Sequence, residues 1–199
     1  MRSTLLVLLV LPFITSAQSD SLFLKTAKEK IINEDYKGAL EELKKTIAND
    51  PSNSSAYYFL GLVTGKLGNT KDAMAHFNKA IELDSKNYLA FKGRGKLKAE
   101  LNDYYGAIAD FTAAIQLKPD FINAYFDRGL SYISLKKFKE ASGDFTKVIE
   151  LNPGDAEAYY MRGNAKIKLM DKLGGCPDIS KAGELGNTKA YELLKQSCK

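Results

Sequence analysis

The sequence predicts an all-α protein that folds as a solenoid of stacked helix pairs. The first observation is a series of aromatic residues that recur every 34 positions: Phe23, Tyr57, Phe91, Tyr125 and Tyr159. The second is that small residues keep the same step, with glycines at Gly61, Gly95, Gly129 and Gly163 and alanines at Ala39, Ala73, Ala107 and Ala141. A fixed period of this length is typical of chains in which each unit buries its apolar face against its neighbours.

The first 17 residues predict a secretory signal peptide. Arg2 provides a positive start, residues 5–14 are apolar apart from Pro12, and residues 15–17 are small residues suited to cleavage before Gln18. This run is short for a membrane span, which favours removal over anchoring. An uncleaved apolar N-terminal helix is the alternative.

Within each 34-residue period the pattern predicts two helices. In the unit 88–121, Phe91, Leu97 and Leu101 recur at helical spacing before residues 102–103 break the run. A second apolar stripe follows from Ala107 to Ile115, and Pro119 ends it. The five predicted units cover residues 20–53, 54–87, 88–121, 122–155 and 156–189. Since a glycine inside a helix costs stability, the glycine series predicts crowded helix–helix contacts.

These positions closely resemble the tetratricopeptide repeat, whose pattern places an aromatic residue, Leu-Gly, Tyr, Ala, Phe, Ala and Pro at fixed places. The resemblance implies a right-handed α-solenoid of about five helix-turn-helix repeats over residues 18–199. The first unit departs from the pattern at Ala27 and Thr46, and the fifth departs from it at Gly175 and Ile179. Weaker matches at both ends are expected of capping repeats.

One pair of positions changes together from repeat to repeat. Arg94, Arg128 and Arg162 each stand 16 residues before an aspartate, namely Asp110, Asp144 and Asp178. In the second repeat both members differ, being Leu60 and His76. This covariation predicts an ion pair between the two helices of one repeat; binding of an external anion by the arginines is the alternative.

The C-terminal region contains the only two cysteines, Cys176 and Cys198. Cys176-Pro177 resembles a helix start, because proline suits the first helical position. That helix would end near Leu185, and a capping helix would occupy residues 188–198. Two short antiparallel helices would bring the cysteines together, so a disulfide is predicted for an oxidising compartment. Two free thiols, or a metal site, are the alternatives.

No catalytic constellation appears in the sequence. His76 is the single histidine, and neither a Gly-Xaa-Ser-Xaa-Gly turn nor a phosphate-binding loop occurs. The predictions are therefore no enzyme activity, no cofactor and no metal. The chain has 29 basic and 24 acidic residues. They alternate along the helices without a dense basic block, so nucleic acid is not an expected partner.

The resemblance implies that function lies on the concave face, which the first helix of each repeat lines. The family's positions there predict a peptide-binding groove of Tyr58, Leu62, Lys92, Lys96, Asn123, Phe126, Leu130, Tyr160 and Asn164. Lys92 and Lys96 stand one helical turn apart, which suits a peptide with apolar anchors and an acidic group. The alternative is that these lysines only solvate a helix face.

The sequence therefore predicts an exported, periplasmic or secreted, non-catalytic scaffold or adaptor that binds a protein or peptide in its groove. One alternative is a module that binds an acidic glycan or cell-wall fragment through Lys92 and Lys96. Another is an accessory subunit of an envelope enzyme. Self-association through the first repeat, near Leu22, Leu24 and Ile31, is a further expectation.

Overall fold

A computed structural model describes residues 16–198, and the predicted signal peptide lies almost wholly outside this range. The described residues form eleven α-helices and no strand. Their bounds are α1 Ser16–Ile32, α2 Tyr36–Asn49, α3 Ser54–Lys66, α4 Thr70–Leu83, α5 Tyr88–Glu100, α6 Tyr104–Leu117, α7 Ile122–Ser134, α8 Phe138–Leu151, α9 Ala156–Lys168, α10 Lys172–Glu184 and α11 Lys189–Ser197.

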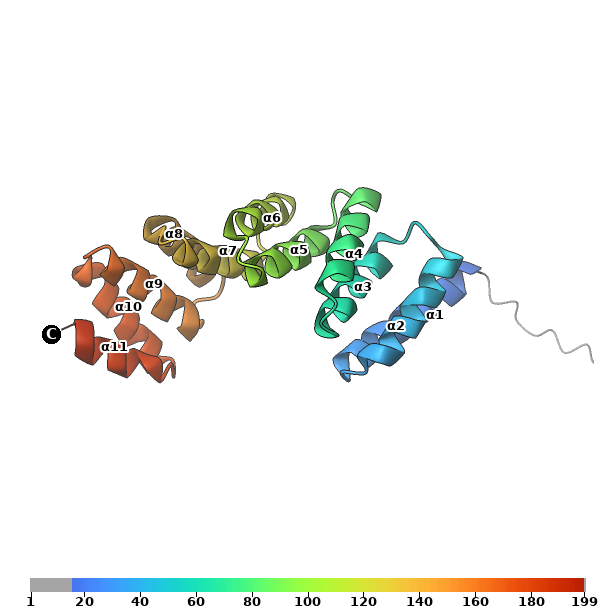
Figure 1. The fold of residues 1–199 in the computed structure, drawn as a ribbon. Coiled ribbons are helices and arrows are strands. Elements are labelled where there is room, and N and C mark those ends of the chain that lie inside the picture. The colour runs from blue at the N-terminus through green and yellow to red at the C-terminus, as the bar shows by residue number, and fades with distance from the viewer. Residues whose placement is uncertain (1–15, 199) are drawn as a thin grey trace, which may run out of the picture.

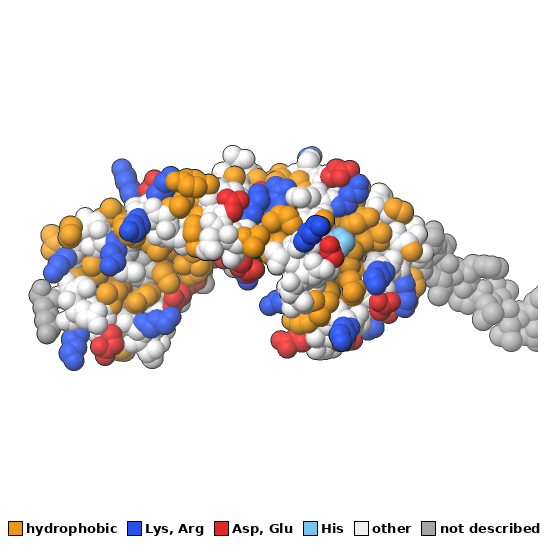
Figure 2. All heavy atoms as spheres, in the orientation of Figure 1, with side chains coloured by type: hydrophobic (Ala, Val, Ile, Leu, Met, Phe, Trp, Pro, Cys, Tyr) orange, Lys and Arg blue, Asp and Glu red, His pale blue; other side chains and the backbone are white. Residues whose placement is uncertain are grey.

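The helices stack as consecutive pairs that form an arch (Figure 1). Each odd-numbered helix from α1 to α9 packs on the helix that follows it, and each pair then packs on the next pair. The first helices α1, α3, α5 and α7 also contact one another across repeats, which makes them the lining of the inner surface. The predicted all-α solenoid is confirmed. On the face shown in Figure 2, basic and acidic side chains are scattered and do not form a single patch.

The turn inside each pair has the same backbone geometry in all five repeats. One residue per turn has a positive φ, and these residues again follow the 34-residue step: Glu34, Gly68, Asn102, Lys136 and Met170. A left-handed residue ends a helix sharply, because the chain turns while the last carbonyl groups still receive hydrogen bonds. The second helix of most pairs then begins at an Asp or Asn whose side chain accepts a backbone N–H, as Asp103 does from Gly106.

The repeated glycines allow the two helices of a pair to approach closely. A Cβ atom at Gly61 would lie 2.6 Å from the ring of Phe77, and one at Gly129 would lie 2.9 Å from the ring of Phe145. At Gly163 the neighbour is Ile179, at 2.6 Å. Phe77 and Phe145 are almost fully buried. The predicted crowding at these glycines is therefore present.

The predicted start of the penultimate helix at Cys176-Pro177 is wrong. Helix α10 begins at Lys172, after Asp171 caps it by accepting the N–H of Gly174, so Pro177 lies inside the helix. The proline removes one backbone hydrogen bond. The helix nevertheless continues, and Ile179 and Ala182 are fully buried against neighbouring helices. The terminal helix α11 agrees with its prediction to within one residue at each end.

Within residues 16–198 no helix has the length and apolar character that crossing a membrane requires. The same residues contain no group of three or more His, Cys, Asp or Glu side chains placed to hold a metal ion.

Candidate functional site

The predicted ion pairs between the two helices of a repeat are confirmed. Arg128 grips Asp144 with two parallel hydrogen bonds, from Nε to Oδ2 at 2.9 Å and from Nη2 to Oδ1 at 2.7 Å. Arg94–Asp110 and Arg162–Asp178 repeat this arrangement. A bidentate contact of this kind fixes both distance and angle between the helices. The arginines are therefore structural residues.

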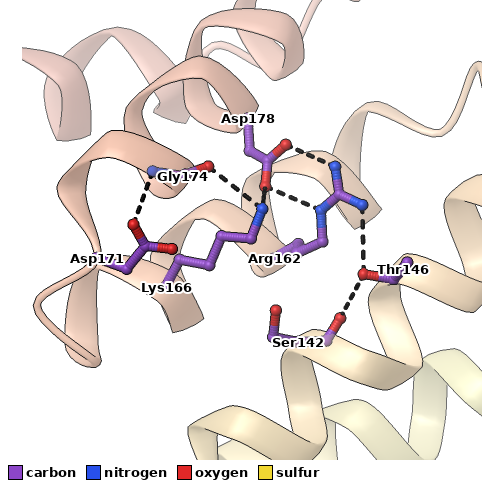
Figure 3. A network of polar contacts seen from close by, with 7 residues as sticks. All are labelled: Ser142, Thr146, Arg162, Lys166, Asp171, Gly174 and Asp178. Carbon is purple, nitrogen blue, oxygen red and sulfur yellow. Dashed lines mark hydrogen bonds and ion pairs between the residues drawn. The ribbon is translucent and has the colours of Figure 1, made fainter.

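The remaining guanidinium nitrogen of each arginine binds the preceding repeat, which the sequence analysis missed. Arg162 Nη1 donates to the hydroxyl of Thr146 at 3.3 Å, and that hydroxyl donates to the carbonyl of Ser142 (Figure 3). The other two arginines donate to Asn78 and Thr112. All three acceptors follow the 34-residue step, which was the available signal. Since every guanidinium nitrogen has a protein acceptor, binding of an external anion by these arginines is not supported.

A lysine supports the buried aspartate in two of the three repeats. Lys98 Nζ lies 2.8 Å from Asp110, and Lys166 Nζ lies 2.8 Å from Asp178 (Figure 3). In the fourth repeat Tyr132 occupies that place, and Asp144 has Arg128 alone. Burial raises the pKa of the Asp144 carboxyl, and Arg128 only partly opposes the effect.

The second repeat replaces the ion pair with an apolar and aromatic contact. Leu60 is buried, and the ring of His76 lies 6.3 Å from the ring of Tyr57. Burial lowers the pKa of His76, and the nearby Asp72 opposes this. His76 is therefore a half-buried packing residue.

The inner surface has two adjacent hollows on either side of α5. The α3–α5 hollow has a volume of about 220 Å³, and the α5–α7 hollow has a volume of about 270 Å³. Phe77 forms part of the first and Phe111 part of the second, and both side chains come from the second helix of a repeat. Lys96 and Glu100 border both hollows, so they form a charged ridge between two apolar floors.

Three glycines line the α3–α5 hollow. Gly61, Gly65 and Gly93 stand on the two helices that form its walls. The Phe77 ring fills the space beside Gly61 and Gly93, since a Cβ atom at Gly93 would lie 2.5 Å from it. At Gly65 the nearest atom to such a Cβ is that of Ala73, at 3.7 Å, so this position has room.

The structure brings together five of the nine predicted groove residues. Tyr58, Leu62, Lys92 and Lys96 line the α3–α5 hollow, and Lys96 also borders the α5–α7 hollow with Leu130. Burial raises the pKa of Tyr58 to about 12, so its phenol is neutral over the physiological range.

The other four predicted residues line neither hollow. They are Asn123, Phe126, Tyr160 and Asn164. Phe126 packs edge-on against Phe145 with ring centroids 5.4 Å apart, and Tyr160 packs against the Ile179 cluster. Both aromatic residues thus contribute to packing between helices.

One lysine of the predicted basic pair, Lys92, has an acidic partner, whereas Lys96 has none among the described residues. Lys92 Nζ lies 3.2 Å from Asp127 Oδ2, at ion-pair distance. The direction of approach does not meet hydrogen-bond geometry, and within the described residues this buried oxygen has no hydrogen-bond donor. Lys66, Lys96 and Glu100 line the hollows and form no ion pair with any described residue.

Gly93 and Asp127 are among the site residues that sequence reasoning missed. They occupy the sixth place of the repeat, where Phe59 and Met161 stand in the second and fifth repeats. The extreme variation at this place, from glycine to aspartate to large apolar residues, was the available signal. A small residue there opens one hollow, and a carboxylate there adds an acceptor to the other.

Two further predictions concern the ends of the chain. Cys176 and Cys198 form a disulfide in the structure, with Cα atoms 5.8 Å apart, which lies within the normal range. At the other end Leu22 is 52% exposed, whereas Leu24 and Ile31 pack against the first core cluster. Only part of the predicted self-association face is therefore open.

Comparison with family models matches three parts of the chain. Models described as tetratricopeptide repeat match residues 24–88 and 122–155, and a model described as TPR repeat matches residues 95–136. The chain belongs to the tetratricopeptide repeat family. A search of curated proteins found no match.

Solved tetratricopeptide repeat structures share the fold. A crystal structure of MamA is 25% identical with a TM-score of 0.73, and the alignment covers 88% of this chain and 96% of MamA. PilF of Pseudomonas aeruginosa is 21% identical with a TM-score of 0.81, covering 90% of this chain and 82% of that one. YrrB, described as a TPR protein with an unusual peptide-binding site, is 23% identical with a TM-score of 0.73, covering 92% and 95%. Family and fold together support a protein-interaction module.

Proposed function

We propose that this protein is an exported, non-catalytic adaptor that binds an extended peptide segment across α3, α5 and α7. The observation that carries the proposal is the pair of apolar-floored hollows separated by the ridge of Lys96 and Glu100. Apolar pockets with a few fixed polar groups are what peptide anchors require. The Asp127 carboxylate, which lines the α5–α7 hollow, would accept a backbone N–H of the bound segment.

The spacing of the hollows defines the expected peptide. Neighbouring helices pack about 8–10 Å apart, and an extended chain advances about 3.3 Å per residue. Two apolar side chains about three positions apart would therefore reach both hollows. An acidic residue beside them would pair with Lys96 or Lys66, which have no ion-pair partner among the described residues.

The test fills one hollow without disturbing the core. Gly65→Leu places a side chain on the wall of the α3–α5 hollow, at a position with room for a Cβ atom. Gly143→Leu is the matched control, because Gly143 is exposed on α8 and a Cβ atom added there would have no neighbour within 4 Å. Both changes replace a helical glycine with leucine, which has the higher helix propensity.

Random peptides displayed on phage would be selected on the unmodified protein and then titrated against both variants by fluorescence anisotropy. We expect the selected peptides to share two apolar residues about three positions apart, and to bind the Gly65→Leu variant at least tenfold more weakly than the control. Equal binding to both variants, or failure to enrich any such peptide, would contradict the proposal.

An acidic glycan or cell-wall fragment is the second candidate ligand, which exposed Lys66 and Lys96 beside one hollow favour. Anionic oligosaccharides would then displace the selected peptides, and Lys96→Glu would abolish their binding. A ligand held by charge alone would lose affinity steeply with added salt, whereas one anchored in apolar hollows would not.

The export part of the proposal rests on the apolar run at residues 5–14 and on the cysteine pair. Disulfides persist in oxidising compartments such as the periplasm. Mass spectrometry of protein released from the envelope of an expressing bacterium should show a chain beginning at Gln18, two mass units lighter than its reduced form. A chain that keeps residues 1–17 would refute export through this signal, and two free thiols would refute the disulfide.

A further inference from the structure

The turn between α9 and α10 exposes a cluster of apolar side chains. Residues 168–173 are all exposed. Among them Met170 is 87% exposed, Leu173 is 93% exposed and Leu169 is 47% exposed. The turn lies at the end of the arch that carries the C-terminus (Figure 1). A cluster of bare apolar side chains at a turn is costly in water unless a partner covers it.

The repeat itself does not require Met170 or Leu173, whereas Leu169 stands at a place where Leu67, Leu101 and Leu135 also stand. At the place of Met170 the other four turns carry Glu34, Gly68, Asn102 and Lys136, and at the place of Leu173 they carry Lys37, Lys71, Tyr105 and Lys139. Met170 also has a φ of 64°, a conformation that methionine adopts less readily than glycine or asparagine. Neither packing nor backbone geometry therefore selects apolar side chains at the places of Met170 and Leu173.

The surroundings of this turn are basic. Lys168 and Lys172 flank the apolar residues and are exposed. The neighbouring turn adds exposed Lys136 and Lys139, and it lies close because Phe138 and Ala165 belong to one packed cluster. Of the acidic residues here, Asp171 caps α10 through Gly174 and Glu140 follows Lys139. Cationic side chains thus outnumber anionic ones around the apolar tip.

We propose that the α9–α10 turn is a membrane-contact site that inserts Met170 and Leu173 into an anionic lipid surface. Apolar side chains on a protruding tip can enter the headgroup region without any complementary hollow, and lysines around them pair with anionic headgroups. A protein partner would instead need a recess shaped to this tip. The contact is independent of the inner hollows, which leaves the peptide groove open while the protein is on the membrane.

The absence of tryptophan from the sequence permits a site-specific test. Leu173→Trp introduces a single tryptophan at the tip, and Ile32→Trp, at a side chain that is 79% exposed beside acidic Glu34 and Asp35, is the matched control. Each protein is mixed with vesicles of phosphatidylglycerol and phosphatidylcholine, or of phosphatidylcholine alone. We expect a blue shift and quenching by brominated lipid for Leu173→Trp with the anionic vesicles only. We expect no change for Ile32→Trp.

Charge removal gives the second measurement. Lys168→Gln and Lys172→Gln in the tryptophan variant should each lower the vesicle partition coefficient about fivefold, or roughly 25-fold together. The Gly65→Leu variant should partition normally, since it affects the groove alone. An unshifted emission of Leu173→Trp with anionic vesicles would overturn the proposal. An equal response to neutral vesicles would also overturn it, as would a response of both tryptophan variants.

Discussion

Asp144 is the buried carboxylate that depends most on a single partner. Its side chain is 7% exposed, and Arg128 is its only ion-pair partner among the described residues. Asp178 is similarly buried, but it retains Lys166 at 2.8 Å if Arg162 is removed. Arg128→Leu and Arg162→Leu therefore delete equivalent arginines from two repeats. The first substitution leaves its aspartate without a cation, and the second leaves its aspartate with a lysine.

The two substitutions should differ in cost. Arg128→Leu leaves Asp144 buried without a cation, and removing one partner of a buried pair costs about 3–5 kcal/mol. After Arg162→Leu, Asp178 keeps a charged hydrogen-bond donor, so the expected loss is that of a hydrogen bond to a charged group, about 1.5–3 kcal/mol. Leucine retains part of the apolar contact of the arginine stem in both proteins.

Urea unfolding followed by far-UV circular dichroism measures this difference at pH 7 with the disulfide intact. The second repeat provides a compensating variant, because it has Leu60 and His76 at these places. Arg128→Leu combined with Asp144→His should recover most of the stability that Arg128→Leu loses. Without that recovery, the loss in the single variant would have another cause than the unpaired carboxylate.

The pH dependence checks the same reasoning. Burial already raises the pKa of Asp144 above its ordinary value of 3.8, and removal of Arg128 raises it further. The folded state then holds the proton more tightly than the unfolded state. The cost of the substitution is therefore full at neutral pH and shrinks as the pH falls toward 3.8. Equal losses for the two arginine variants, or a loss for Arg128→Leu that is independent of pH, would refute the argument.

Three further predictions concern separate parts of the chain. Proton NMR of His76, the only histidine, should give a pKa below 6.5, since burial disfavours its charged form; a value of 6.5 or more would contradict its half-buried placement. Cys198→Ser should lower the free energy of unfolding by about 3 kcal/mol under oxidising conditions, because the disulfide closes a loop with a sequence separation of 22; the two proteins should be equally stable in a reductant. Gly93→Ala should destabilise the protein by about 1–3 kcal/mol through the clash with Phe77. Gly143→Ala should instead stabilise it by up to about 1 kcal/mol, and thermal unfolding compares the two.

The packing of the central repeats could be predicted because they obey the same local rule. Gly129 must face Phe145, because the glycine series and the aromatic series share the 34-residue step and only a residue without a Cβ atom fits against the ring. The Arg128–Asp144 contact was predictable for a different reason. Its equivalents in the second repeat change together, and a buried charge cannot lose its partner alone.

Other features could not be predicted because they depend on several residues at once. The dipeptide at Pro177 predicts a helix start when only its neighbours are considered, yet Asp171 caps the helix earlier. The burial of Ile179 then outweighs the one backbone hydrogen bond that the proline removes. Phe126 occupies a groove place of the family, but its ring packs edge-on against Phe145. Which side chain fills a space and which leaves it open depends on the shapes of its neighbours, and residue type alone does not reveal them.

The hollows illustrate this dependence most clearly. Phe77 and Phe111 are equivalent, and both are nearly buried floors. At the sixth place of the adjoining first helix, however, one hollow has Gly93 and the other has Asp127. The first is therefore an apolar recess lined by glycine, and the second has a carboxylate in its lining. Two sites on one repeated frame thus differ in chemistry through a single place, so Asp127→Ala should abolish the preference of a selected peptide for an N–H donor at the α5–α7 hollow and leave its two apolar anchors unchanged.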